Sequence, residues 1–317
     1  MSFDLIIPFL KPIEPLLVST SVSEIMVNSN ASVWVEEDGR KRLLPEIRFD
    51  PGTLDAALEV IANRFGKKLD VDSPILNLRL PDGSRLAAMI PPVVNPHPLM
   101  TIRRFTSRNF TMADLVAKEM LTAGHASELT ERVRRGDNIL IAGGTGSGKT
   151  TLLNVLADAI PDEDRILVIE DTAELHIRKP HVVSAESQTD THRSSVTFDD
   201  LLKAVLRHRP DRILVGEVRG AEARTLLDAM NTGHRGTLAT IHASGAEEAV
   251  HRLATLAMRS SGGLGLPAVI NEVERCLDLV VYISRRDGKR CAEELLEISP
   301  RISLLPTIAP SPGEPSS

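Results

Sequence analysis

The sequence has few cysteines, few aromatic side chains and no excess of positive charge. Its two cysteines, Cys276 and Cys291, are too few for a disulfide framework or a four-cysteine zinc module, and they fit a reducing compartment best. Aromatic residues make up only 3% of the 317 residues, which disfavours a stacking platform for single-stranded nucleic acid. The formal net charge is −6, so the basic surface of a dominant nucleic-acid partner is missing, and we expect no stable nucleic-acid binding.

Long apolar runs are also lacking. No stretch approaches the roughly 18 uninterrupted apolar residues that a membrane span needs. The N-terminal stretch "DLIIPFLKPIEPLL" is apolar, but three prolines interrupt it and it lacks the basic start of a signal peptide. We expect an ordered arm packed on the protein; contact with a membrane surface or a partner is the alternative.

Two folded regions of different character are indicated. In the first, "EIMVN" and "SVWVEE" are typical of short strands, and residues 53–65 have helical periodicity with Thr53 as the N-cap. From residue 126 onward, helices alternate with apolar strands, which predicts a parallel sheet covered by helices. The predicted organisation is a mixed α/β domain over 1–105, a linker over 106–125, an α/β domain over 126–303 and a disordered Pro- and Ser-rich tail over 304–317.

Turn and cap signals place several of these elements. Hairpins are expected at Asp38-Gly39, at 81–83 and at Asp287-Gly288. Thr197 and Asp200 are spaced as a capping box at a helix start. Gly136 is placed to end the helix that opens the second region.

The stretch "GGTGSGKTT" fits the phosphate-binding pattern G-x-x-x-x-G-K-[ST] and lies between an apolar strand and an amphipathic helix. Its glycines let backbone N–H groups point at phosphate oxygens, and the helix adds its positive end. Lys149 is expected to reach the β- and γ-phosphates and Thr150 to ligate Mg²⁺. The predicted nucleotide-binding residues are Gly143, Gly144, Thr145, Gly146, Ser147, Gly148, Lys149, Thr150 and Thr151.

Two apolar strands end in acidic residues: "RILVIED" at Glu170-Asp171 and "RILVGE" at Glu217. The carboxyl ends of parallel strands face the ligand crevice, where acids bind Mg²⁺ or orient an attacking water. We predict that Glu217 serves catalysis and the metal, Glu170 catalysis and Asp171 the metal. Capping or salt-bridge roles stay open for all three, and the sequence does not divide the roles of Glu170 and Asp171.

Two histidines follow in "NTGHRGTLATIH". His242 ends a strand, so we expect it to sense the γ-phosphate or to link it to a subunit contact. For His234, in a Gly-x-x-Gly turn, a functional role and an ordinary polar role are equally open. Their spacing is not a zinc pattern.

The motifs "GGTGSGKTT", "VIEDTAEL", "RPDRILVGEVRGAEA" and "NTGHRGTLATIHA", in this order, resemble the ATPases of type II and type IV secretion. The resemblance covers roughly residues 23 to 300. It implies a hexameric ring whose subunits have an N-terminal mixed α/β, PAS-like domain and a C-terminal RecA-like P-loop domain, with ATP between them. In that family's terms Glu217 matches the Walker B acid and His242 the histidine of the His box.

Finer features favour one branch. The chain lacks the four-cysteine loop of type II members and has Glu-Asp-Thr where pilus motors have Glu-Asp-Pro, so it looks like the conjugal-transfer ATPases of the TrbB type. This resemblance implies a cytoplasmic protein, peripheral to the inner membrane, with secretion-machinery proteins as partners. A tight-adherence or type IV pilus assembly ATPase, a nucleic-acid translocase and a nucleotide switch with negligible turnover remain alternatives.

ATP hydrolysis in a ring also requires a positive charge at the γ-phosphate. An arginine can supply this charge, which raises the rate of hydrolysis by about 10³- to 10⁵-fold. The second region offers no obvious candidate. The first offers Arg85 and the pair Arg103-Arg104 in "TIRRF". By resemblance, such arginines approach the triphosphate as the domains close; the alternative is a solvated arginine on a strand.

Overall fold

A computed structural model describes residues 6–30, 32–37, 39–104, 110–171, 173–187, 196–260, 262–286 and 288–298. The chain forms two compact units, Met1–Asn109 and Phe110–Ser317. The predicted tail over 304–317 lies outside the described residues.

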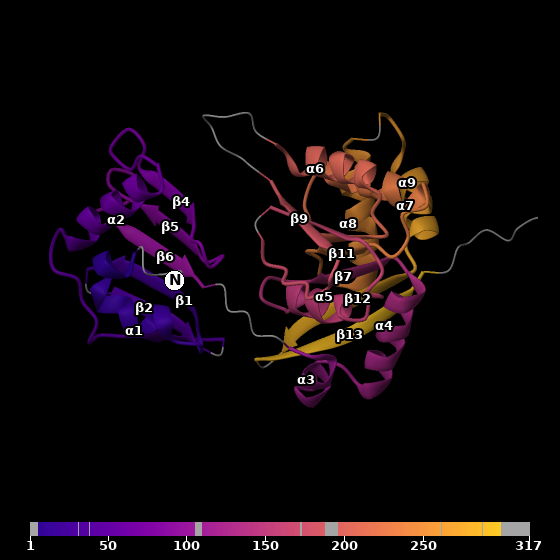
Figure 1. The fold of residues 1–317 in the computed structure, drawn as a ribbon, viewed down its shortest axis with the longest axis horizontal. Coiled ribbons are helices and arrows are strands. Elements are labelled where there is room, and N and C mark those ends of the chain that lie inside the picture. The colour runs from indigo at the N-terminus through magenta and orange to yellow at the C-terminus, as the bar shows by residue number, and fades with distance from the viewer. Residues whose placement is uncertain are drawn as a thin grey trace, which may run out of the picture. The chain divides into compact units, whose positions relative to one another are not determined.

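The first unit is built on a six-stranded antiparallel sheet with the order β3-β2-β1-β6-β5-β4 (Figure 1). Its strands are β1 (Val22–Ser29), β2 (Ser32–Glu37), β3 (Arg40–Leu43), β4 (Ile75–Arg79), β5 (Arg85–Met89) and β6 (Leu99–Arg103). The hairpins predicted at 38–39 and 81–83 join β2 to β3 and β4 to β5. The two central strands β1 and β6 are far apart in the sequence, so their pairing holds the unit together.

One face of this sheet is covered by α2 (Thr53–Arg64) and by an N-terminal arm of three short helices, η1 (Ile7–Phe9), η2 (Lys11–Ile13) and α1 (Glu14–Val18). The arm buries four large side chains completely: Ile6, Leu10, Ile13 and Leu17. The expectation of an arm packed on the protein is therefore confirmed, and these side chains have no surface to offer a membrane.

The N-cap predicted for α2 is wrong. The capping position is taken by Gly52, which adopts a left-handed conformation at φ 77° and makes no side-chain cap. Thr53 is thereby shifted into the first turn. Left-handed backbone favours glycine, and nothing in the sequence of the helix itself indicates this conformation at Gly52.

The second unit contains a seven-stranded sheet with the order β13-β12-β7-β11-β10-β8-β9. Its strands are β7 (Ile139–Gly143), β8 (Ile166–Glu170), β9 (Val182–Glu186), β10 (Arg212–Val218), β11 (Leu238–Ile241), β12 (Leu279–Arg286) and β13 (Lys289–Glu297). All neighbours pair in parallel except β13, which returns antiparallel to β12 in the hairpin expected at 287–288. The parallel strands therefore end at one common edge.

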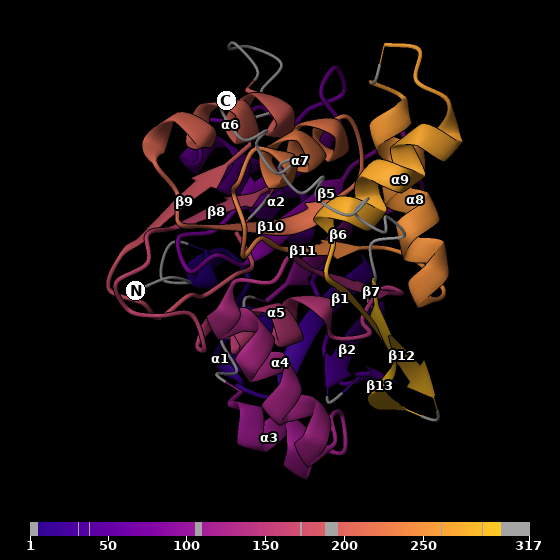
Figure 2. The same cartoon turned by 90° about the vertical axis from the view of Figure 1, so that its right-hand side faces the viewer.

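Helices cover both faces of this sheet, as Figures 1 and 2 show from two sides. One face carries α3 (Met112–Ala117), α4 (Ala123–Arg135) and α5 (Lys149–Ala157). The other carries α6 (Phe198–Val205), with the short η3 (Leu206–His208) after it, α7 (Glu222–Asn231), α8 (Ala246–Met258) and α9 (Leu266–Cys276). Every residue of β7, β8 and β11 is buried, as expected for strands covered on both faces.

The second unit begins earlier than the sequence indicates. Thr111 and Asp114 form a capping box that starts α3, inside the stretch taken for a linker. Leu115, Met120 and Leu121 are buried in the core beneath α4 and α5. Apolar side chains thus tie residues 110–125 to this unit. In the described part of the chain no helix combines the length and apolarity that crossing a membrane requires.

Candidate nucleotide site

The loop between β7 and α5 has the backbone that a phosphate cradle requires. Gly146 and Gly148 are left-handed, at φ 71° and 105°, and Gly143 has φ 156°. A Cβ on Gly143 would stand 2.3 Å from the carbonyl oxygen of Ile283 and 2.6 Å from the Ser147 hydroxyl oxygen. Only glycine fits there, so the loop is held tightly against β12 while its amides precede the start of α5.

Two side chains of this region, Lys149 and Ser147, are suited to binding an anion. The Lys149 ammonium donates to the carbonyl oxygens of Gly143 and Gly144, at 3.0 and 3.1 Å. Burial lowers the pKa of Lys149, and the charge of Glu217 opposes this shift. Ser147 is only 2% exposed, and its hydroxyl oxygen has no hydrogen-bond partner within the described ranges. A half-buried cation and an unsatisfied buried hydroxyl in a glycine cradle fit a bound phosphate chain.

The two acidic strand ends differ in their surroundings. Glu170, at the end of β8, is 3% exposed, and its Oε1 accepts the backbone N–H groups of Glu174 and Leu175 at 2.8 and 2.9 Å. It therefore holds the loop that follows its own strand. Asp171 has a side chain 45% exposed, and its Oδ1 accepts the Ser187 hydroxyl at 3.0 Å.

Glu217 lies on the adjacent strand β10 with its side chain 23% exposed. Its carboxylate is held by Arg219, which donates through Nε at 3.0 Å and also through Nη2. The same guanidinium lies 3.6 Å from Asp171. Burial alone would lower the pKa of Arg219. The hydrogen bond to Glu217 and the negative charges of Glu217 and Asp171 outweigh burial, so the pKa is raised overall. Arg219 thus joins the carboxyl ends of β10 and β8.

Sequence reasoning missed Arg219 and Glu174. Both lie within the quoted motifs, and Arg219 is two residues after Glu217. The charge of Glu174 acts on both Lys149 and Arg219. Spacing alone does not show these interactions, because Arg219 also approaches Asp171 after β8, and Glu174 acts on residues from two other segments.

The two histidines lie at opposite ends of the strand β11. His242 directly follows β11 and is exposed. The last residue of β11, Ile241, pairs with Ala142, so His242 lies level with Gly143 at the start of the cradle. His234 precedes β11, and its Nδ1 lies 3.2 Å from the carbonyl oxygen of Ala229 at the end of α7. Of the two roles left open for His234, its place at the amino end of β11 and its contact with Ala229 favour the ordinary polar one.

The β12–β13 hairpin touches the other side of the cradle. Arg290 Nε donates to the carbonyl oxygen of Gly146 at 3.1 Å. A Cβ on Gly148 would meet Arg290 Cδ and Met120 Cε, each at 3.2 Å. Neither residue was singled out by the sequence, because the contacts bring together three distant segments.

The candidate arginines of the first unit fall into two groups. Arg103 pairs with Arg85 across β6 and β5, and Arg85 pairs with Arg79 across β5 and β4, so these three form an arginine row. Their neighbours Leu78, Leu86 and Ile102 are buried, which puts the row on the sheet face away from the core.

Arg104 differs from the row. Its Nη1 donates to the carbonyl oxygen of Leu16 in the N-terminal arm at 3.4 Å. Burial lowers the pKa of Arg104, and the charge of Asp82 opposes the shift. These contacts give Arg104 an anchoring role within the unit.

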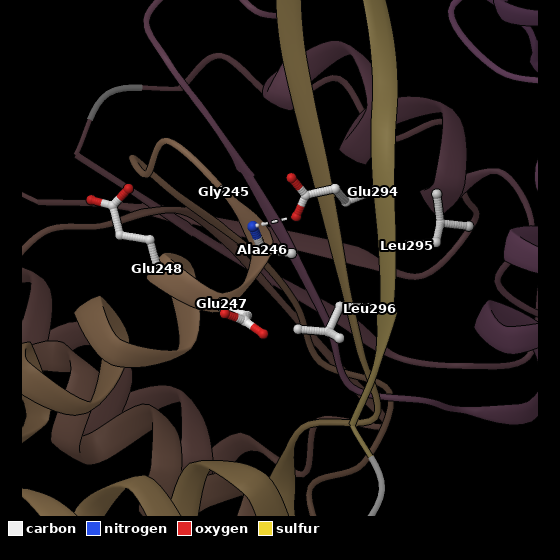
Figure 3. Close-up of a pocket in the computed structure, with 7 residues that line it drawn as sticks. All are labelled: Gly245, Ala246, Glu247, Glu248, Glu294, Leu295 and Leu296. Atoms are coloured by element: carbon white, nitrogen blue, oxygen red, sulfur yellow. Dashed lines mark hydrogen bonds between the residues drawn. The ribbon is translucent and has the colours of Figure 1, made fainter.

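A separate hollow of about 500 Å³ lies between the start of α8 and β13. Figure 3 shows Glu294 capping the helix, where its carboxylate accepts the Ala246 N–H at 3.0 Å. Glu247 and Glu248 also line it. Three carboxylates disfavour an anionic ligand, and α8 lies on the opposite sheet face from α5. The glycine cradle is therefore the better nucleotide site.

No group of three or more His, Cys, Asp and Glu side chains is arranged for a metal ion among the residues that the structure describes. Mg²⁺ in a nucleotide site takes several of its ligands from the phosphates and one or two from the protein. Thr150, half-buried in the first turn of α5, and the acids Glu217 and Asp171 are the side chains available for it.

The fold and the cradle together define a two-domain P-loop protein. A family model described as type II/IV secretion system protein matches residues 10–309, and the chain belongs to this family. It is 37% identical over 288 residues to the conjugal transfer protein TrbB of Rhizobium radiobacter, covering 89% of this chain and 85% of the relative. It is 34% identical over 319 residues to the type IV secretion system protein VirB11 of Bartonella quintana, covering 88% and 89%.

Solved structures agree. The VirB11 ATPase of the Brucella suis type IV secretion system is 25% identical with a TM-score of 0.51, covering 92% of this chain and 94% of that one. The Legionella pneumophila ATPase DotB matches with a TM-score of 0.67 over 92% of this chain and 81% of its own, at 23% identity, which supports the fold alone. The predicted family and the RecA-like P-loop fold are confirmed.

Proposed function

We propose that this chain is an ATPase that works as a homo-oligomeric ring, a hexamer, and powers conjugal transfer or a related type IV secretion step by coupling hydrolysis to domain motion. The observation that carries the proposal is the glycine cradle, where Lys149 donates to Gly143 and Gly144, in the same sheet whose strand β10 carries Glu217 at its carboxyl end. The names of its relatives, TrbB and VirB11, support the biological setting.

The chain's own residues divide the work as follows. The amides of the cradle and Lys149 would hold the phosphates, and Thr150 would ligate Mg²⁺, which would supply positive charge to the phosphates. Glu217 orients the attacking water and accepts its proton. Asp171 would help to hold the metal, and His242 would sense the γ-phosphate.

An arginine from the first unit completes this proposal. The arginine row presents Arg85 and Arg103 side by side on the open face of the first sheet. Positive charge on the γ-phosphate is worth about 10³- to 10⁵-fold in rate. Domain closure would then bring the charge to the site and link chemistry to motion.

We further propose that the protein acts at the cytoplasmic face of the inner membrane, held there by secretion-machinery proteins. Four large apolar side chains of the N-terminal arm, Ile6, Leu10, Ile13 and Leu17, lie in the core, so we assign the attachment to protein contacts rather than to this arm.

The test is phosphate release from Mg-ATP by the purified full chain, with light scattering to measure the size of the oligomer. K149A should abolish turnover while melting like the wild type, because it removes the charge that holds the β- and γ-phosphates. K203A is the matched control, since that lysine pairs with Asp199 on the exposed face of α6. Normal turnover in K149A would refute the site, and nucleotide binding without turnover in the wild type would indicate a switch.

A further inference from the structure

The glycine cradle has two unlike sides, and the strand order defines them. On one side of β7 lie β11, β10 and β8, whose ends carry His242, Glu217 and Asp171. On the other side lie β12 and β13. Gly143 pairs with Ile283 of β12, so the hairpin borders the cradle directly.

Among the cations of the β12–β13 hairpin, Arg290 is one that contacts the cradle. Its Nε donates to Gly146, and its Cδ stands against Gly148, so the side chain lies along the outer rim of the cradle. The hairpin that carries it is fixed at the same place. Ala292 N–H donates to the Met120 carbonyl oxygen at 2.9 Å, and Lys289 forms an ion pair with Glu119.

The polarity of a bound nucleotide follows from these two sides. Glu217, proposed to orient the attacking water, lies near the carboxyl end of β10, so the phosphate that is hydrolysed lies toward β10. The chain of phosphates then runs across the cradle, and its nucleoside end emerges toward β12 and β13. Resting on the proposed function, we propose that Arg290 is a nucleotide-binding residue that contacts the phosphate next to the ribose.

The chemistry of the side chain suits this role. A guanidinium stays charged at all working pH values and presents planar N–H donors that match phosphate oxygens. ATP and ADP share the phosphate next to the ribose. Arg290 therefore contributes to the affinity for both nucleotides and leaves the hydrolytic step to Glu217.

The experiment compares the full-length wild type with R290A, R290K and R290Q. Calorimetry measures the Kd for Mg-ADP, and phosphate release measures KM and kcat. In R290A the Kd for ADP and the KM for ATP should both rise about 5- to 20-fold, as expected for losing one charge-assisted contact at a partly solvated site. The kcat should stay within about twofold. R290K should recover most of the affinity, whereas R290Q should bind as weakly as R290A.

The glutamine variant separates the two roles of the side chain. Lysine and glutamine both have a donor for the Gly146 carbonyl oxygen, but only lysine has the charge. Equal rescue by R290Q and R290K would show that Arg290 merely supports the loop, and this would overturn the proposal. Wild-type affinity in R290A would overturn it too, as would a loss of kcat with KM unchanged.

R286A is the matched control, because Arg286 belongs to the same hairpin and pairs with Glu293 instead. It should bind ADP like the wild type. Melting curves without nucleotide identify any variant that is not folded, and the comparison of R290K with R290Q then decides. A wild type that neither binds ADP nor releases phosphate would instead refute the proposed function.

Discussion

Glu170 and Glu217 end neighbouring strands, yet their carboxylates face different groups. Glu170 accepts two backbone N–H groups and is almost fully buried, whereas Glu217 pairs with Arg219 and has a half-buried side chain. A carboxylate whose lone pairs hold backbone amides is poorly placed to orient water. We therefore propose that Glu217 performs the chemistry and that Glu170 supports the loop leading to Glu174.

E217Q should bind ATP with nearly unchanged affinity and hydrolyse it about 10²- to 10⁴-fold more slowly, because the amide keeps the shape and loses the basic oxygen. Binding is measured by calorimetry and turnover by phosphate release. Loss of binding in this variant would make Glu217 a structural residue.

E170A should lower the free energy of unfolding by about 2–4 kcal/mol, since it leaves two amide donors near the core without an acceptor. Urea unfolding measures this. E163A, a change at an exposed glutamate nearby, should alter stability by less than about 0.5 kcal/mol. If E170A unfolds at the same urea concentration as E163A, the two hydrogen bonds do not stabilise the fold.

At the end of the strand β6, two arginines that are adjacent in the sequence have different surroundings. Arg103 belongs to the arginine row, and Arg104 anchors the N-terminal arm at Leu16. Successive side chains of a strand point to opposite faces, so neighbours in sequence have different surroundings.

R103A should reduce turnover at least tenfold while the oligomer and the melting temperature stay unchanged, because it removes charge that stabilises the γ-phosphate in the transition state. R104A should instead lower the melting temperature, with turnover that follows the folded fraction. R40A, at an exposed position of β3, should behave like the wild type. The opposite pattern, with R104A folded but inactive, would transfer the catalytic role to Arg104.

Elements with strong local signals were predictable from the sequence. The capping box of Thr197 and Asp200 starts α6, and Gly136 ends α4 in a left-handed conformation, because these signals act within a few residues. The helices α8 and α9 and the strand β9 were not predicted. Arg219 and Arg290 were missed for a different reason: Arg219 also approaches Asp171 after β8, Arg290 donates to Gly146 in the loop after β7, and only the folded sheet brings these segments together.

The boundary between the two units lies at residue 110, and it determines where the chain is best cut to study the second unit alone. A chain starting at Phe110 keeps α3 and the buried Leu115, Met120 and Leu121, whereas one starting at residue 126 loses them. Met120 also touches the cradle at Gly148. The earlier boundary is therefore required for an intact site.

The chain starting at Phe110 should fold, bind ADP within about threefold of the full-length affinity and hydrolyse ATP at least about 100-fold more slowly, because the arginine row is gone. The chain starting at residue 126 should lose several kcal/mol of stability through its missing apolar contacts. Circular dichroism, calorimetry and phosphate release measure the three properties. Full activity in the isolated second unit would place the required positive charge within that unit.

The central pairing of β1 with β6 also governs how the first unit is made. During synthesis β1 and β2 emerge early, but β6 is the last strand of its sheet to leave the ribosome. Until then the nascent chain exposes one unpaired edge of β1, which is a template for wrong association. The stretch from Leu99 to Arg103 closes that edge and also carries an arginine of the row. The same short segment thus completes the folding of the unit and equips it for its proposed task.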